Sequence, residues 1–285
     1  MSGIKIIECP RDAMQGLNHL IPLDVKVNYI KKLLSVGFDT IDVGSFVSPK
    51  AIPQMADTSE VLNQIGKNQM HSQLLVIVAN KRGIDEAVLQ KGVHYLGFPF
   101  SVSETFQQRN TNAGIEAAFD TVKYLTNVCR INNKKPVVYL SMAFGNPYGD
   151  PWNAEIVMKW ADKLIECGVD IISLADTIGV AQPKTIEYLF SHLVPGFSHV
   201  EFGAHLHTQP NNWHEKLEAA FSNGCRRFDG AIMGFGGCPM AKDELVGNMA
   251  TENLLHFFDE KGINLGLNMQ AFGEALTAAP LVFNH

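Results

Sequence analysis

The 285-residue sequence contains few cysteines and no cysteine pattern typical of a metal cluster or a disulfide framework. The cysteines are odd in number and form no CxxC pair; they are Cys9, Cys129, Cys167, Cys225 and Cys238. These properties argue against a structural zinc site and against a small secreted fold held by disulfides. We therefore expect free thiols in a reducing compartment.

Long apolar runs and segregated charge are also missing. No run of 18 apolar residues occurs, and the N-terminal segment MSGIKIIECPRD has no Arg/Ser-rich or long apolar leader, which predicts a cytoplasmic protein without a membrane partner. The formal net charge of −6 comes from acids and bases mixed along the chain, so no nucleic-acid partner is expected. No Pro/Ser-rich linker divides the sequence, and we expect residues 1–285 to form a single catalytic domain.

Short β-branched apolar runs alternate with longer amphipathic segments. The runs are predicted to be strands at Ile4–Cys9, Thr40–Val43, Leu74–Val78, Tyr95–Pro99, Pro136–Met142, Ile171–Ala175, Val200–His205 and Arg227–Ile232. The segments are predicted to be helices at Val25–Ser35, Asp85–Gln90, Ile115–Cys129, Asn153–Glu166, Pro183–His192, Asn212–Ser222 and Thr251–Glu260. This alternation favours an α/β fold, a closed (β/α)8 TIM barrel, over the alternative of an open doubly wound sheet.

Chemically useful side chains follow the predicted strands. In a (β/α)8 barrel the catalytic groups lie at the carboxyl-terminal ends of the strands. The groups at such positions are Arg11 and Asp12 after the first strand, Asp42 at the end of the second, Asp176 after the sixth, His205 and His207 at the end of the seventh, and Cys238 after the eighth. Scattered surface polarity would seldom produce this pattern, so we predict an active site at this end of the barrel.

The spacing of His205 and His207 indicates a metal site. Residues two apart on a strand point to the same face, so both imidazoles can bind one ion. The alternative is a pair of histidines that only form hydrogen bonds at a strand end. With Asp12 as a third ligand the metal interpretation is favoured, and mixed oxygen and imidazole ligands suit Mg²⁺ or Mn²⁺.

Arg11 and Cys238 are candidates for the chemistry beside such an ion. A buried Arg11 would stabilise a developing enolate oxygen, whereas an exposed Arg11 would form only a weak surface ion pair with Asp12. Cys238 lies in the glycine-rich segment GFGGCP, where a thiol on a loop can carry protons or can simply be an inert part of a turn. A phosphate-binding loop is disfavoured because the GxGxxG spacing is absent.

Asp176 and Asn248 each have two interpretations. Asp176 is either a catalytic carboxylate or a helix N-cap, a role that Thr177 could fill instead. Asn248 is either a fourth metal ligand through its amide oxygen or the N-cap of the last predicted helix. The residues alone leave both pairs of alternatives open.

The chain resembles the 3-hydroxy-3-methylglutaryl-CoA (HMG-CoA) lyase branch of the metal-dependent lyase and Claisen-condensing barrels, from about Ile4 to about Gly273. The segments that carry the resemblance are Pro10-Arg11-Asp12-x-x-Gln15, Ser45-Phe46-Val47-Ser48-Pro49-Lys50, Pro53-Gln54-Met55-x-Asp57, Asp176-Thr177-Ile178-Gly179-Val180, His205-x-His207, Gly236-Gly237-Cys238-Pro239 and Gly247-Asn248-x-Ala250-Thr251-Glu252. The GGCP loop and the SFVSPK block indicate the lyase branch rather than the synthase branches.

This resemblance implies a role for each candidate residue. The implied metal ligands are Asp12, His205, His207 and Asn248. Arg11 and Gln15 would lie near the acyl carbonyl, Asp42 would take the place of the family's glutamate, and Cys238 would be the loop thiol that moves protons. Positions that line the substrate pocket or support its polar network are matched by Ser45, Asn110, Tyr148, Ser173 and Asp176.

The implied reaction is a divalent-metal-dependent cleavage of HMG-CoA into acetoacetate and acetyl-CoA, by a homo-oligomeric enzyme whose partner is an acyl-CoA. Several residues depart from the family pattern: Ala13 replaces a glycine, Asp42 replaces a glutamate, Thr208 replaces an aspartate, and Gly16-Leu17-Asn18 replaces polar residues. Two alternatives follow. One is a related aldolase or Claisen-type lyase for another 3-hydroxyacyl-CoA or a 2-keto acid, and the other is a catalytically silent metal-binding barrel.

Overall fold

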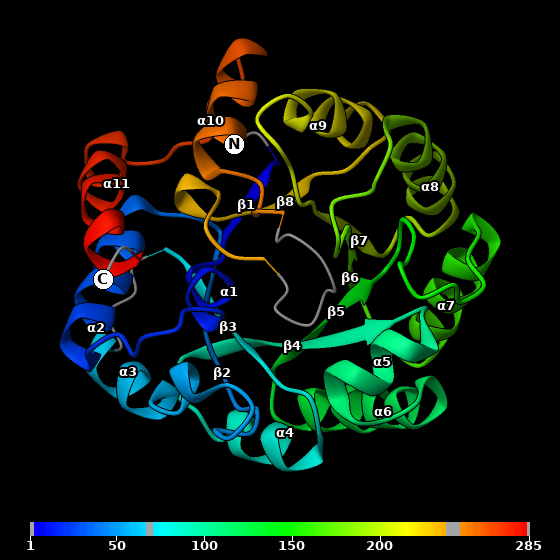
Figure 1. The fold of residues 1–285 in the computed structure, drawn as a ribbon, viewed down its shortest axis with the longest axis horizontal. Coiled ribbons are helices and arrows are strands. Elements are labelled where there is room, and N and C mark those ends of the chain that lie inside the picture. Colours follow the sequence, from blue (N-terminus) through cyan, green and yellow to red (C-terminus); the bar gives the residue numbers. More distant parts are fainter. Residues whose placement is uncertain (1–2, 67–70, 238–245, 284–285) are drawn as a thin grey trace.

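The computed structural model describes residues 3–66, 71–237 and 246–283 as a closed parallel barrel. Its strands pair in the order β1-β2-β3-β4-β5-β6-β7-β8, and β8 returns to β1. Most helices form a ring around this barrel, and the short helix Pro10–Gln15 lies inside that ring (Figure 1). The strands are β1 (Lys5–Glu8), β2 (Thr40–Ser45), β3 (Gln73–Ile77), β4 (Val93–Ser101), β5 (Lys135–Ser141), β6 (Ile171–Ala175), β7 (Glu201–His205) and β8 (Arg227–Gly230).

The predicted (β/α)8 class is confirmed, and each predicted strand overlaps one of the observed strands. The helices are α1 (Pro10–Gln15), α2 (Leu23–Val36), α3 (Thr58–Ile65), α4 (Lys81–Val88), α5 (Glu104–Thr111), α6 (Ile115–Ile131), α7 (Ala154–Glu166), α8 (Pro183–Gly196), α9 (Trp213–Ser222), α10 (Thr251–Glu260) and α11 (Met269–Phe283), with short 3₁₀ turns η1 (Pro53–Met55) and η2 (Ile232–Gly234). Helices α1, α3, α5 and α11 were not predicted from the sequence.

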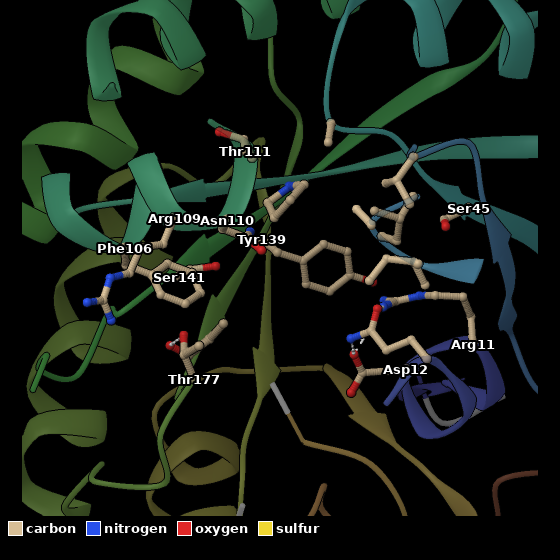
Figure 2. Close-up of a pocket in the computed structure, with 18 of the residues that line it drawn as sticks. Arg11, Asp12, Ser45, Phe106, Arg109, Asn110, Thr111, Tyr139, Ser141 and Thr177 are labelled. Atoms are coloured by element: carbon tan, nitrogen blue, oxygen red, sulfur yellow. Dashed lines mark hydrogen bonds and ion pairs between the residues drawn. The ribbon is translucent and has the colours of Figure 1, made fainter. Parts of the chain in front are cut away.

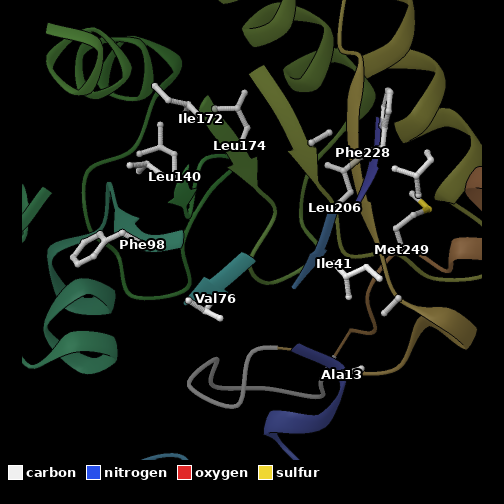
Figure 3. Packing of buried hydrophobic residues seen from close by; sticks show 14 of the residues in the cluster. Ala13, Ile41, Val76, Phe98, Leu140, Ile172, Leu174, Leu206, Phe228 and Met249 are labelled. Carbon is white, nitrogen blue, oxygen red and sulfur yellow. The ribbon is translucent and has the colours of Figure 1, made fainter. Parts of the chain in front are cut away.

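Two apolar layers hold the barrel together. The larger layer lies between the outer faces of the strands and the helices, and Figure 3 shows part of it, including Ile41, Val76 and Phe228. The smaller layer fills the inside of the barrel with Leu75, Ile77, Val137, Tyr139 and Ile171. Because successive strand residues point to opposite faces, one strand supplies both layers. The inner layer leaves the strand ends free to carry polar groups.

The helix ends follow local sequence signals. Asn80, Ser103 and Asn153 accept hydrogen bonds from backbone N–H groups in the first turns of α4, α5 and α7, which satisfies donors that a helix leaves unpaired. Gly37 ends α2 at φ +86°, a conformation that glycine adopts without steric cost. Within the part of the chain that the structure describes, no helix is long and apolar enough to cross a membrane.

Candidate metal and substrate site

Helix α1 brings three polar side chains of the first βα connection together. Pro10 occupies a position in the first turn, where its missing N–H costs nothing and its fixed φ favours the helix. Arg11 and Asp12 are therefore helical residues, buried at the carboxyl-terminal end of β1. One turn later, Gln15 donates from Nε2 to Asp12 Oδ1 at 2.9 Å and accepts from Arg11 Nη1 at 2.8 Å.

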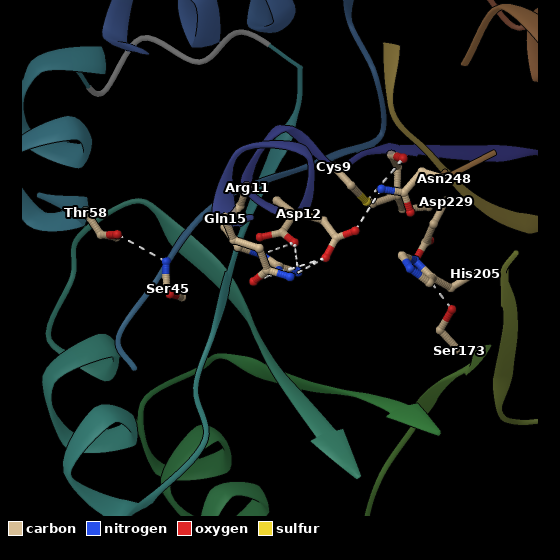
Figure 4. Close-up of polar contacts among 12 residues, drawn as sticks. Cys9, Arg11, Asp12, Gln15, Ser45, Thr58, Ser173, His205, Asp229 and Asn248 are labelled. Carbon is tan, nitrogen blue, oxygen red and sulfur yellow. Dashed lines mark hydrogen bonds and ion pairs between the residues drawn. The ribbon is translucent and has the colours of Figure 1, made fainter. Parts of the chain in front are cut away.

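The guanidinium of Arg11 is held by two carboxylates (Figure 4). Its Nε and Nη2 atoms donate to Asp42 Oδ2 at 2.9 and 2.6 Å, and Nη1 donates to Asp12 Oδ1 at 3.0 Å. The expectation that Asp42 ends its strand is wrong, because β2 continues to Ser45. The register of β2 against β3 shifts between Asp42 and Gly44, and such bulges redirect neighbouring side chains near functional sites.

Burial and neighbouring charges determine the ionisation of Arg11, Asp42 and Asp12. Burial lowers the pKa of Arg11, but the negative charges of Asp42 and Asp12 outweigh this effect and raise it, so the cation is permanent. Burial raises the pKa of Asp42 to about 6, although Arg11 acts in the opposite direction. For Asp12, burial raises the pKa, while Arg11, His205 and His207 more than compensate and lower it. Asp12 is therefore ionised at neutral pH, and the Arg11 guanidinium favours the ionised form of Asp42.

Asp12, His205 and His207 form the cluster that the sequence predicts. Each offers one ligand atom, and these atoms lie within 4.8 Å of one another at buried or half-buried positions. Burial lowers the pKa of His207 to about 4, so its imidazole is neutral and able to bind a cation at physiological pH. One carboxylate and two imidazoles suit a divalent ion that keeps open coordination positions. The described residues therefore fit a metal.

Asp229 orients His205, and sequence reasoning missed it. Its Oδ2 lies 3.1 Å from His205 Nδ1 and accepts a hydrogen bond from the Ser173 hydroxyl at 3.5 Å. Burial lowers the pKa of His205, but the hydrogen bond and charge of Asp229 and the charge of Asp12 raise it overall. A carboxylate on the second imidazole nitrogen fixes the ring and its tautomer in metal sites. The available signal was an aspartate inside the predicted eighth strand.

Lys216 binds the backbone of His207, and sequence reasoning also missed this residue. It lies on α9, is 1% exposed, and its Nζ donates to the backbone carbonyl of His207 at 2.9 Å and to Asp176 Oδ2 at 2.7 Å. Asp176 also accepts from the backbone N–H of Ala181 at 2.9 Å. Asp176 thus joins the loops after β6 and β7 and is not an N-cap, because the N-cap residue of α8 is Gln182.

The Asn248 side chain contacts Asp12 and does not cap helix α10. Its Nδ2 donates to Asp12 Oδ2 at 2.7 Å and to the Phe235 carbonyl at 2.9 Å. The N-cap of α10 is Ala250, so the N-cap alternative for Asn248 is wrong. Its role as a metal ligand through the amide oxygen stays a prediction. In this geometry the side chain holds the Asp12 carboxylate in place.

The glycine segment after β8 packs directly on this polar cluster. Gly236 has φ +99°, and a Cβ atom there would lie 2.6 Å from Asn248 Nδ2 and 3.0 Å from the Asp12 carbonyl oxygen. Glycine is therefore required for the close approach. Cys238, the predicted proton carrier, lies outside the described residues.

A cavity of about 480 Å³ opens beside the cluster. In Figure 2, Arg11 and Asp12 lie on one side of it and Phe106 and Arg109 on the other. Other lining residues include Gln15, Ser45, Asn110, Tyr139, His205 and His207. Of the predicted substrate residues, Tyr148 and Ser173 do not line this cavity. Tyr148 stacks on Phe106 and beneath the Arg109 guanidinium, whereas Ser173 supports Asp229.

Known proteins resemble this chain in sequence and in fold. The HMGL-like family model matches residues 4–278. The mitochondrial hydroxymethylglutaryl-CoA lyase of Mus musculus is 34% identical over 95% of this chain and 83% of its own length, and the hydroxymethylglutaryl-CoA lyase of Pseudomonas mevalonii is 32% identical over 96% and 90%. An HMG-CoA lyase structure from Acinetobacter baumannii, in complex with coenzyme A and 3-methylmalate, superposes with a TM-score of 0.90 at 28% identity and covers 100% of this chain and 93% of that one.

Proposed function

The chain belongs to the HMGL-like family, and on this premise we propose that it is a divalent-metal-dependent carbon–carbon lyase that cleaves HMG-CoA into acetoacetate and acetyl-CoA. One observation carries the proposal: Asp12, His205 and His207 converge beside the Arg11 guanidinium, and all four residues line one cavity. A permanent cation next to a divalent-ion cluster suits a reaction that develops negative charge on a thioester oxygen.

The residues that would hold Mg²⁺ or Mn²⁺ are Asp12, His205 and His207, with Asn248 as the proposed fourth ligand. Such an ion acidifies a bound hydroxyl group and orients a neighbouring carboxylate of the substrate. Asp229 and Lys216 keep the two histidines in position, through the imidazole of one and the backbone carbonyl of the other.

The side chains supply the proton transfers and the charge stabilisation. Asp12 or His205 accepts the proton of the substrate's tertiary hydroxyl. The carbon–carbon bond then breaks, a ketone forms, and the electron pair passes to the thioester fragment as an enolate. Arg11 stabilises the enolate oxygen because Asp42 and Gln15 hold the guanidinium in a fixed orientation. Cys238 or His205 returns a proton to the enolate carbon.

A coupled assay for acetoacetate tests this proposal. The purified protein is expected to release acetoacetate from HMG-CoA with Mg²⁺ or Mn²⁺ under reducing conditions, and Arg11→Gln is expected to lower kcat strongly. The control is Arg82→Gln, which removes an exposed arginine on α4. No turnover by the reduced, metal-loaded wild-type protein would overturn the proposal.

A related 3-hydroxyacyl-CoA is the second candidate substrate. Thr208 stands where the family has an aspartate, and the buried Lys216 cation binds the backbone carbonyl of the preceding residue, His207, so the charge near the metal cluster differs from the family pattern. A panel of 3-hydroxyacyl-CoA thioesters and 2-keto acids separates the two candidates. HMG-CoA is expected to give the highest kcat/KM, and a higher kcat/KM for another compound of the panel would favour the second candidate.

We further propose that residues 1–285 act as one catalytic domain in a cytoplasmic homo-oligomer. Family membership is the support for the oligomer, and light scattering during gel filtration measures it. A monomer at assay concentration would remove this part of the proposal without affecting the lyase reaction.

A further inference from the structure

A second group of metal-binding side chains lies directly against the proposed catalytic cluster. Cys9 follows β1, Asp229 lies in β8 and His205 ends β7, so the three residues come from neighbouring strands of the closed barrel. One ligand atom from each lies within 4.8 Å of the others. Figure 4 shows Cys9 and Asp229 beside His205, near Asn248. The two clusters share His205 and otherwise use different residues.

Asp229 presents a buried oxygen to this cluster. The residue is 3% exposed, and while Oδ2 contacts His205 and Ser173, Oδ1 has no hydrogen-bond partner among the described residues. Buried polar atoms without partners are rare in proteins and indicate either a functional group or a bound species. A cation at this position would satisfy the oxygen.

The surrounding charge also favours a cation. Within this region of the barrel, the carboxylates of Asp12, Asp42 and Asp229 face two guanidinium groups, those of Arg11 and Arg227. A divalent ion with one thiolate and one carboxylate would form a neutral unit, which lowers the cost of burying charge.

We propose that Cys9, His205 and Asp229 form an inner site for a thiophilic divalent cation such as Zn²⁺, distinct from the Asp12–His205–His207 cluster. Sulfur, nitrogen and oxygen ligands together are typical of zinc, whereas Mg²⁺ and Mn²⁺ prefer oxygen and imidazole ligands. Binding replaces the thiol proton of Cys9, which is released to solvent, and forms a metal–sulfur bond. Because Asp229 contacts His205 through Nδ1, an inner ion bound at that nitrogen would replace this hydrogen bond and change how the ring is held for the catalytic ion.

Cobalt binding tests the inner site without any substrate. Co²⁺ replaces Zn²⁺ and gives a charge-transfer absorption in the near ultraviolet only when a thiolate binds it. Metal-free wild-type protein titrated with Co²⁺ is expected to show this band with saturation, and Cys9→Ser is expected to lose it. Cys225→Ser and Cys238→Ser are expected to keep the band. Cys225 is a matched control, because its thiol is equally buried and donates hydrogen bonds to the Phe202 and Arg227 carbonyls.

Each outcome decides the proposal. Absence of the band in the wild type, its persistence in Cys9→Ser, or its loss in Cys238→Ser would each overturn the inner site. If Cys9→Ser does not fold, anomalous scattering at the zinc edge from wild-type crystals grown with Zn²⁺ replaces the variant: a peak between Cys9 and Asp229 supports the site, and a peak only between Asp12 and His207 contradicts it.

The effect on catalysis rests on the proposed function, but the binding measurement does not. A cobalt band without acetoacetate release would remove the proposed reaction and keep the inner site. Acetoacetate release without a cobalt band would do the opposite, so the two failures are distinguishable.

Discussion

The two ends of the barrel both bury an arginine among carboxylates, but the surroundings differ. At the carboxyl-terminal end, Arg11 contacts Asp12 and Asp42 and lines the cavity. At the amino-terminal end, Arg227 is fully buried, donates to Glu201 at 3.0 Å and stacks over the Tyr95 ring at 5.7 Å. Glu201 also accepts a hydrogen bond from Lys5, so one carboxylate pairs with two cations at this end of the barrel.

This difference indicates that the buried charges at the cavity end serve ligand binding and those at the other end serve folding stability. Charges at the cavity end face a space that a ligand can enter, whereas those at the other end form ion pairs in which Glu201 contacts both Lys5 and Arg227. Active sites of (β/α)8 barrels lie at the carboxyl-terminal face, and the opposite face contributes stability. Substitutions at the two ends should therefore change different measurements.

The largest effect is expected from His207→Ala at the cavity end. Loss of one of three clustered ligands should weaken Mn²⁺ binding by more than ~100-fold, beyond the 10–100-fold typical of residues that only support a ligand. Electron paramagnetic resonance of free Mn²⁺ measures the Kd. Unfolding of the metal-free protein should change far less, because Lys216 holds His207 through its backbone and not its ring. Unchanged Mn²⁺ affinity would break the comparison.

Arg227→Met at the closed end should act on stability instead. The substitution removes the cation that faces the buried Asp229 carboxylate and also pairs with Glu201, so we expect the free energy of unfolding to fall by about 3 kcal/mol. Denaturant unfolding measures this loss. The Kd for Mn²⁺ should change less than in His207→Ala, and a metal defect equal to that of His207→Ala would show that the two ends are coupled.

The two buried lysines sharpen the comparison further. Lys216 and Lys26 each bind a carboxylate and at least one backbone carbonyl, but only Lys216 contacts a proposed ligand residue. Lys216→Met should destabilise the fold more than Lys26→Met, because Asp176 is buried and Asp57 is partly exposed. Only Lys216→Met should raise the Mn²⁺ Kd, by roughly 10–100-fold. Lys216→Arg is expected to recover part of the affinity. Equal Kd values for the two methionine variants would contradict a positioning role.

A pH effect is expected at Glu8, which lies next to the cavity end but outside the cavity. Burial raises its pKa from 4.5 to about 8, and it accepts hydrogen bonds from Thr251 and the Ile232 backbone. The folded state thus keeps Glu8 protonated: its contribution to stability is complete below pH 4.5 and is lost as the pH rises towards 8. Glu8→Gln cannot lose a proton, so its stability relative to the wild type should increase over this range, with a slope of at most ~1.4 kcal/mol per pH unit. Parallel stability curves would contradict an ionisable Glu8.

The smallest effect is expected from Arg82→Ala on the outer surface. The Arg82–Glu86 ion pair on α4 is half exposed, and such helix pairs contribute about 0.3–0.5 kcal/mol. Thermal unfolding and Mn²⁺ binding should both stay close to the wild type. A large change in the melting temperature or in the Mn²⁺ Kd would contradict the assignment of stability and metal binding to the two ends of the barrel.

The sequence predicted most of the fold but not the residues that hold the metal-binding side chains in position. Eight short apolar runs were enough for the barrel, because each strand needs one face inside and one against the helices. Helix α1 was missed because it is only six residues long, although Pro10 was an available signal. Asp42, expected at a strand end, lies within β2 because the strand continues through a bulge.

The amino-acid sequence by itself determined the repeating pattern of strands and helices, and it placed Arg11, Asp12, His205 and His207 at strand ends. The order of residues within each segment is sufficient for these predictions, because hydrophobic periodicity and helix capping depend only on residues close together in the sequence. Only the tertiary structure decided that Asp229 would orient His205 and that Lys216 would hold His207. These contacts join different strands or a strand end and a helix, and they exist because closing the barrel brings separate segments into one buried space.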